Sequence, residues 1–183
     1  FEALSELIQE TADEIRYLES VSNSLDIALS EADLGQIKEE LTASGYVRRK
    51  FTKKKVKLTN KPMHYISSDG YDIYVGKNNI QNDELTFSFA NGGDWWFHAK
   101  GAPGSHVIVK TNGDELPDRT FEEAGRLAAY YSKSRGSDKV EIDYVEKKHV
   151  KKPNGAKPGF VVYYTNYSLM IDSDISTIKA VQD

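Results

Sequence analysis

The chain has 183 residues, of which 39% are hydrophobic and 28% charged, and its mean hydropathy is −0.57. This composition fits a packed chain of one or two domains, and no stretch approaches the roughly 20 apolar residues of a membrane-spanning helix. Cysteine is absent, which excludes disulfide frameworks, thiolate metal sites and cysteine nucleophiles. The chain begins at Phe1 rather than at Met and has no signal peptide there, a beginning typical of a fragment of a longer protein.

The net charge of −4 is unevenly distributed. Residues 1–47 hold 11 Asp and Glu against 2 Lys and Arg, whereas residues 48–183 hold 17 against 22. An acidic first part and a basic second part indicate two regions with different neighbours, and the basic part is suited to a polyanion.

The first region has the pattern of a long helix. Mostly aliphatic residues recur at alternating spacings of four and three, and we call them the heptad seam: Leu4, Ile8, Thr11, Ile15, Leu18, Ser22, Leu25 and Leu29. Two interpretations stay open, a helix packed on its own domain or one arm of an antiparallel coiled coil. In the second case residues 1–30 are expected to bury the seam by self-association or by folding back on residues 33–44. A second helix is expected from Asp33 as N-cap to Gly45 as C-cap signal, which completes a helical segment over residues 1–45.

Residues 46–62 form a basic linker. Eight cations and no acid lie within fourteen of its residues: Arg48, Arg49, Lys50, Lys53, Lys54, Lys55, Lys57 and Lys61. Such a run is either a solvated tether or an arm that binds phosphate.

Residues 63–183 show short alternating segments around one helix. Asp69-Gly70 predicts a hairpin, and the expected helix begins with a capping box between Thr120 and Glu123 and ends near 134–136. Strands are expected at 64–67, 71–75, 85–89, 94–98, 106–110, 140–144, 160–165 and 168–171. The predicted fold class is α+β, a largely antiparallel sheet with one main helix, preceded by the N-terminal helical segment.

The segment from Asp94 to Val109 carries the most information about function. Both tryptophans of the chain, Trp95 and Trp96, are adjacent, so in a strand they point to opposite faces. We expect one to pack inward and the other either to face outward, where it could stack on a base, or to meet another element of the fold.

A tight turn is expected directly after this strand. Pro103-Gly104-Ser105 could present backbone N–H groups to a phosphate or to a backbone carbonyl beside His106, with Gly104 at positive φ. If His106 faces the surface, its replacement should be mild for stability.

The sequence contains no motif for catalysis or metal binding. The histidines, His64, His98, His106 and His149, lack ligand spacing, and no nucleophile elbow, Walker-type loop or dinucleotide fingerprint is present. We therefore expect no enzyme activity, no metal and no cofactor.

A second basic cluster lies at residues 147–157. It contains Lys147, Lys148, Lys151, Lys152 and Lys157, and Lys133 and Arg135 follow the expected helix. Together with the linker, these segments could converge on one surface. Lysine-rich clusters interleaved with aromatics favour nucleic-acid binding, mainly through phosphate.

Several of these motifs resemble one family. Asp94-Trp95-Trp96-Phe97-His98, Pro103-Gly104-Ser105-His106-Val107, residues 128–132, residues 145–153 and Gly159-Phe160-Val161 resemble the NFACT-R domain of bacterial NFACT proteins of the RqcH group, also described as fibronectin-binding protein A-like. The resemblance covers roughly residues 60–175. It implies domains at 1–45 (end of the family's middle coiled coil), 46–62 (linker) and 63–183 (NFACT-R).

The resemblance also implies a function. A cytoplasmic ribosome quality-control factor would bind the large ribosomal subunit, rRNA and tRNA at stalled nascent chains and support C-terminal tailing. The family's N-terminal domain is not seen in this sequence, so the tailing activity itself is not expected here. The alternative is a surface adhesin fragment that binds fibronectin.

The residues expected to bind RNA come from the motifs and the basic clusters. They are Arg48, Arg49, Lys53, Lys54, Lys55, Trp95, Trp96, His98, Lys100, Gly104, Ser105, His106, Lys133, Arg135, Lys147, Lys148, Lys151 and Lys152.

Overall fold

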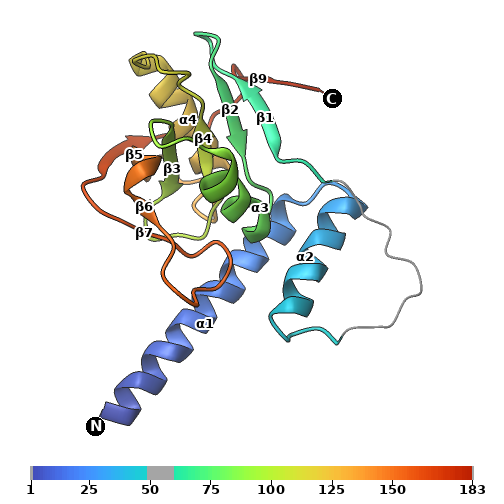
Figure 1. The fold of residues 1–183 in the computed structure, drawn as a ribbon. Helices are drawn as coiled ribbons and strands as arrows, with labels where there is room; N and C mark the ends of the chain where they lie inside the picture. Colours follow the sequence, from blue (N-terminus) through green and yellow to red (C-terminus); the bar gives the residue numbers. More distant parts are fainter. Residues whose placement is uncertain (1, 49–59, 183) are drawn as a thin grey trace.

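The structure, a computed structural model, describes residues 2–48 and 60–182 (Figure 1). Two helices, α1 (Glu2–Ile27) and α2 (Glu31–Ala43), precede a body of short strands and helices. Its elements are β1 (Met63–Ile66), β2 (Asp72–Val75), α3 (Asn79–Glu84), the π-helix η1 (Leu85–Phe89), β3 (Trp95–Ala99), β4 (Val107–Val109), α4 (Asp118–Tyr130), β5 (Val140–Glu146), the 3-10 helix η2 (Lys147–His149), β6 (Val150–Lys151), β7 (Val162–Tyr163), β8 (Tyr167–Ile171) and β9 (Lys179–Ala180).

A seven-stranded sheet organises the body. Its strand order is β8-β5-β3-β4-β2-β1-β9, and every neighbouring pair is antiparallel. Strands β6 and β7 form a separate antiparallel pair. The predicted α+β class with a largely antiparallel sheet and a long N-terminal helix is confirmed.

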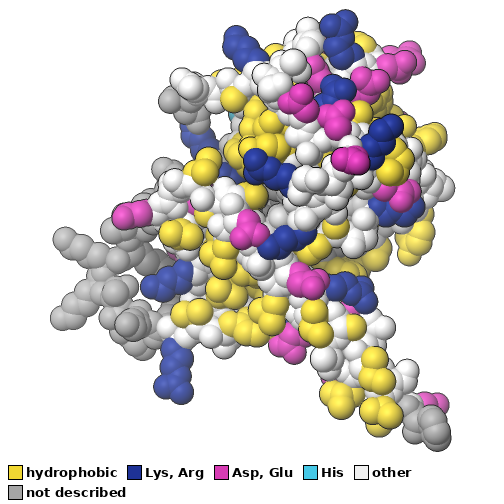
Figure 2. Space-filling model, turned by 180° about the vertical axis from the view of Figure 1, so that it is seen from behind, with side chains coloured by type: hydrophobic (Ala, Val, Ile, Leu, Met, Phe, Trp, Pro, Cys, Tyr) yellow, Lys and Arg dark blue, Asp and Glu magenta, His cyan; other side chains and the backbone are white. Residues whose placement is uncertain are grey.

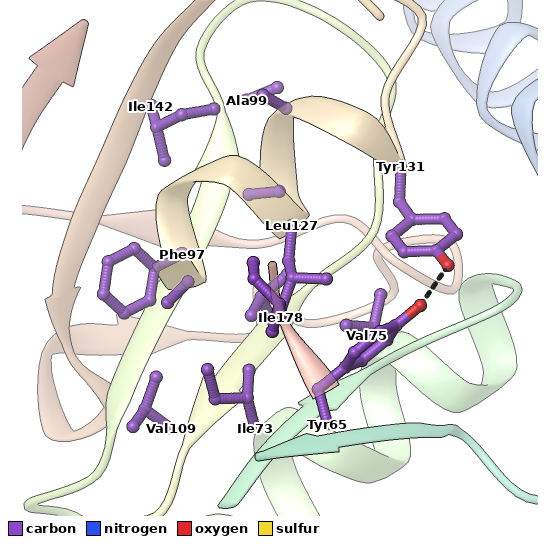
Figure 3. Close-up of a cluster of buried hydrophobic side chains, with 14 of the residues drawn as sticks. Tyr65, Ile73, Val75, Phe97, Ala99, Val109, Leu127, Tyr131, Ile142 and Ile178 are labelled. Carbon is purple, nitrogen blue, oxygen red and sulfur yellow. Dashed lines mark hydrogen bonds between the residues drawn. The ribbon is translucent and has the colours of Figure 1, made fainter. Parts of the chain in front are cut away.

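Both faces of this sheet are covered. Helix α4 lies on one face, where Leu127 packs among Ile73, Phe97 and Ile142 (Figure 3). The hydroxyls of Tyr65 and Tyr131 share a hydrogen bond of 2.5 Å at the edge of this core (Figure 3). Burial raises the pKa of Tyr131, so both hydroxyls stay protonated and the polar pair is satisfied inside the core.

The opposite face is covered by η1, which precedes β3 in the chain, and by β6 and β7, which follow β5. Leu85 of η1 and Val150 of β6 pack on Trp96, Ile108 and Val145. Because strand neighbours alternate between faces, β3 is buried on both sides, as central strands are when elements cover each face.

Two local predictions in the body were wrong. Residues 85–89 continue α3 as η1 instead of forming a strand, and the Thr86 hydroxyl is bound to His106 at 2.8 Å, a tertiary contact that outweighs the strand-like alternation. Helix α4 begins after Pro117, without a capping box, because Thr120 and Glu123 bond instead to the β1–β2 turn, and it ends at Tyr130.

Helices α1 and α2 pack together beside the body. The N-cap of α2 is Ser30 rather than Asp33. The Ser30 hydroxyl accepts from the Asp33 backbone N–H, and the Asp33 carboxylate accepts from the Ser30 backbone N–H, which completes a capping box. The C-terminal signal was correct, since Gly45 has φ 85° just past the helix.

The buried face of α1 is not the heptad seam, and its Tyr17 and Val21 pack on Ile37 of α2. Tyr17, Val21 and Ser24 are buried, whereas Ile8 and Ile15 of the seam are 62% and 52% exposed. Figure 2 shows hydrophobic side chains on the projecting end of this helix. Within the described residues, no helix has the length and apolarity needed to cross a membrane.

Candidate functional site

Strand β3 lies at the centre of the sheet between β4 and β5. Trp95 points to the α4 face, where its ring centroid lies 4.9 Å from that of Phe121. Trp96 points to the other face and has no exposed surface. Of the two alternatives for the second tryptophan, contact with another element is therefore the one found, because α4 covers the face to which Trp95 points.

The motif residues instead line a small pocket beyond the end of β3. This motif pocket has a volume of about 370 Å³ and lies between α1, the turn at 101–104 and the segment 158–163. Its inner wall includes Trp96, His98 and His106, and Tyr163 lies 4.9 Å from Trp96 between ring centroids. The structure thus brings together residues that are separate in the sequence.

The two histidines of the motif pocket are held as neutral rings. Their centroids are 5.6 Å apart and the ring planes are perpendicular. Burial lowers the pKa of His98, and burial together with His98 lowers the pKa of His106 well below its ordinary 6.5. Neutral imidazoles do not attract phosphate by charge, so their contribution is shape and hydrogen bonding.

His106 is an interior residue. It is 2% exposed, its Nδ1 lies 2.8 Å from the Thr86 hydroxyl, and its backbone N–H donates to Asn82 at 3.0 Å. His106 therefore does not face the surface, and its replacement is not expected to be mild for stability.

The turn after β3 differs from its prediction. Gly101 has φ 65°, whereas Gly104 is not in the positive-φ region and pairs across a β-bridge with Ser132. A Cβ on Gly104 would lie 3.0 Å from the Cβ of Ser132, so a close approach, not positive φ, requires glycine here. The Ser105 N–H donates to the backbone carbonyl of Tyr131 at 3.0 Å, so of the two partners expected for this turn the structure shows the carbonyl.

One group of cations lies beyond the end of β3. Lys100 pairs with Glu141 at 2.7 Å, Lys133 pairs with Asp26 of α1, and the Arg135 guanidinium lies 3.6 Å from the centroid of Tyr130. These side chains lie around the C-terminal end of β3, where the motif pocket also lies.

A second group lies at the start of β3. The backbone of Lys147 and Lys148 bonds to Asp94 and Gly92, while the Lys151 side chain is exposed. Lys152 does not belong to this group: it is tied to Asp83 at 2.9 Å, and its charge acts on His106 of the motif pocket. Strand β3 thus separates Lys147 and Lys148 from Lys133 and Arg135.

The linker cations are described only in part. Arg48 is exposed, while Arg49, Lys53, Lys54 and Lys55 lie outside the described residues. Their part in RNA binding stays a prediction.

Sequence reasoning missed the pocket wall contributed by the helices and the 157–160 segment. Tyr17 and Ser20 of α1 and Asn79 of α3 line the motif pocket, and Lys157 lies 4.6 Å from the centroid of Tyr17. No local signal could have joined segments so far apart. Among residues 2–48 and 60–182, no cluster of three or more His, Asp or Glu is suited to hold a metal ion.

Comparison with known proteins identifies the class of this domain. Residues 61–165 match the family model of the NFACT protein RNA binding domain, and residues 1–60 match the model of the NFACT N-terminal and middle domains. The chain belongs to the NFACT family.

Several relatives are similar over nearly the whole chain. The Rqc2 homolog RqcH of Streptococcus suis is 45% identical over 180 residues, which are 98% of this chain and 32% of the relative. The Rqc2 homolog RqcH of Bacillus subtilis is 41% identical over 178 residues, 96% and 31%. The chain therefore spans about a third of the length of these relatives.

Similarity extends to a more distant protein and to a solved structure. The human ribosome quality control complex subunit NEMF is 37% identical over 81 residues, 43% of this chain and 7% of the relative. The C-terminal structure of the fibronectin/fibrinogen-binding protein from Streptococcus suis has a TM-score of 0.89 and 44% identity, covering 97% of this chain and 72% of that one.

Proposed function

We propose that this chain is the RNA-binding module of a ribosome-associated quality-control factor. It binds the large ribosomal subunit, rRNA and tRNA at stalled nascent chains in the cytoplasm and supports C-terminal tailing by the longer protein. The observation that carries the proposal is the match of residues 61–165 to an RNA-binding family model. The names of the RqcH and NEMF relatives support the ribosomal setting.

The module acts by binding rather than by catalysis. Contacts are mainly to phosphate, because the basic segments supply lysines and the chain has no motif for reading bases in a duplex. The candidates are the linker cations together with Lys147, Lys148 and Lys151. The neutral rings of the motif pocket position the surrounding backbone.

The salt dependence of RNA binding tests this proposal. Gel shifts of the 183-residue chain with tRNA across a salt series give the slope of log affinity against log salt. Replacing Lys53, Lys54 and Lys55 with Ala is expected to reduce the slope by about 0.7 for each phosphate that a lysine neutralises on a single strand, or about 0.9 on a duplex.

One control variant accompanies the salt series. Lys38→Ala, an exposed lysine on α2 outside the basic clusters, is expected to leave the slope unchanged. A slope that the triple variant does not alter would exclude the linker, and no RNA binding at any salt would overturn the proposal.

A second candidate function is fibronectin binding at a cell surface. It is favoured by the similar structure from Streptococcus suis, which is that of a protein named for fibronectin and fibrinogen binding. A pull-down with immobilised fibronectin, run beside the gel shift at the same salt, separates the two functions.

A further inference from the structure

A second and larger cavity lies apart from the motif pocket. It has a volume of about 680 Å³ and opens between the β1–β2 hairpin and the α3–η1 segment, on the sheet face opposite α4. None of its lining residues lines the motif pocket. Its size lies within the range of roughly 300–1,000 Å³ typical of small-ligand sites.

Aromatic rings form one side of this aromatic cavity. His64 and Tyr74 are paired across β1 and β2, and their rings stack with centroids 4.5 Å apart and planes 6° apart. Asp72 holds the His64 ring through a contact of 2.7 Å to Nε2. Phe89 of η1 meets Tyr74 edge-on at 4.8 Å. Flat rings fixed in this way form a wall suited to another flat ring.

The rim of the cavity leaves aromatic surface in water. Phe89 is 45% exposed, although its neighbour Tyr74 packs against the cluster around Trp96. An exposed aromatic ring beside a cavity is a common feature of single-strand RNA sites, where a base covers the ring.

The charges around the cavity distinguish a base from a phosphate. The Lys110 Nζ lies 4.9 Å from the Phe89 centroid, and Lys61 lines the cavity. Glu84 and Ser88 also line it, and within the described part of the chain neither side chain has a hydrogen-bond or ion-pair partner. A carboxylate repels phosphate but accepts hydrogen bonds from an amino group, so the acidic side suits the edge of a base.

We propose that the aromatic cavity binds an unpaired RNA nucleobase, which stacks beside Tyr74 and Phe89 with an amino edge toward Glu84. The inference rests on the proposed RNA-binding function and adds a base-specific subsite to it. All of the lining residues lie within residues 61–165, which match the RNA-binding family model, and this favours RNA over a peptide. Adenine, cytosine and guanine carry an amino group and uracil does not, so uracil is expected to bind most weakly.

Two oligomers of equal charge test for a base in the cavity. Filter binding compares an eight-nucleotide oligoadenylate with an abasic oligomer of eight sugar-phosphate units, which carries the same number of phosphates. The 183-residue protein is used at one fixed salt concentration. The oligoadenylate is expected to bind on the order of tenfold more tightly, the size of one base–aromatic stack.

Substitution at the rim identifies the ring that is used. Phe89→Ala is expected to remove most of this difference while affinity for the base-free chain stays the same. Phe89→Leu is a second variant that keeps apolar volume without a flat ring, and it is expected to behave alike. Tyr164→Ala is the matched control, since Tyr164 is 69% exposed and lines neither pocket.

The edge contact has its own test. Glu84→Gln is expected to reduce the preference for oligoadenylate over oligouridylate severalfold, with Glu122→Gln on α4 as the control. An unchanged preference would overturn the assignment of Glu84 to the base edge.

The outcomes separate this inference from the proposed function. Equal, salt-dependent affinity for the base-bearing and base-free chains would overturn the subsite while leaving phosphate-driven RNA binding intact, and a peptide would then be the better occupant. A base-dependent difference that survives both Phe89 variants would also overturn it. Failure to bind any oligomer or tRNA would overturn the proposed function and the subsite together.

Discussion

Strand β3 and helix α1 carry the two clearest sequence patterns, and they lie in opposite environments. In β3, Trp96, Phe97 and Ala99 have no exposed surface, whereas Leu4 and Ile8 of α1 are 60% and 62% exposed. The tryptophan-rich motif that looked like a binding surface is interior, and the apolar seam that looked like a packing surface faces water. A strong pattern therefore indicates which residues act together, while its exposure depends on the elements that cover it.

The largest expected effect comes from removing the interior ring of β3. Trp96→Ala is expected to lower the free energy of unfolding by about 3–5 kcal/mol, because a large buried side chain leaves a cavity among Ile108, Val145 and Tyr163. Urea unfolding measures the change. Tyr164→Ala, at an exposed site, is expected to change it by less than about 0.5 kcal/mol. Equal effects of the two variants would contradict the buried placement of β3.

The turn that ends β3 is expected to give an intermediate effect. Gly104→Val forces a Cβ against Ser132, with an expected cost of about 1–3 kcal/mol. Gly101→Ala meets no atom within 4 Å and is strained only by its φ of 65°, at a cost of about 1 kcal/mol. The urea midpoints of the two variants compare the cost of the close contact at position 104 with the cost of backbone strain at position 101. A larger loss of stability in Gly101→Ala would contradict the expectation that the close contact costs more.

The buried histidines make stability depend on pH. The pKa of His106 in the folded state lies well below 6.5, so as pH falls below 6.5 the unfolded chain takes up protons that the folded chain does not. Stability should therefore fall toward lower pH, by at most about 1.4 kcal/mol per pH unit for each such histidine. Burial also lowers the pKa of His98, so this residue contributes to the pH dependence with the same sign.

Thermal unfolding between pH 7 and pH 5 measures this dependence. His106→Gln is expected to reduce the slope, whereas His149→Gln, at an exposed position, should leave it unchanged. Asp33 does not contribute to the slope between pH 7 and pH 5. Burial alone would raise its pKa, but Lys77 and the backbone lower it to about 2, so its contribution to stability is lost only below about pH 3.8. If the pH slope of stability is unchanged in His106→Gln, the pH dependence arises from other groups.

The smallest expected effect on stability belongs to α1. Replacing Ile15 and Leu18 with Lys should change the melting temperature little, because both side chains are largely exposed. If the heptad seam pairs with a second helix, the wild-type chain should self-associate and the variant should sediment as a monomer. A wild-type chain that is monomeric at every concentration would count against seam-mediated self-association, and a large loss of melting temperature would show that the seam packs on the body.

Local signals predicted most of the sheet but not its covering. The Asp69-Gly70 turn and the alternation at 140–144 correctly located β1, β2 and β5, since both signals depend on neighbouring residues. The alternation at 85–89 was misread as a strand, so nothing in the sequence placed η1 over Trp96.

The candidate sites follow the same division. The hairpin alone could have paired His64 with Tyr74, because its register is set by the turn. Phe89 could not have been added, since its position depends on the helical path of η1. The motif pocket likewise needed α1 and the 158–163 segment, which come together only in the folded chain.

The adjacent positions of Trp95 and Trp96 have a spectroscopic consequence. The chain has no other tryptophan, so all of its indole fluorescence originates from the middle of the sheet. Helical circular dichroism, in contrast, comes mainly from α1 and α2, which have 26 and 13 helical residues against 13 in α4. The two signals, recorded on one sample, therefore show whether α1 and α2 unfold together with the sheet or separately from it.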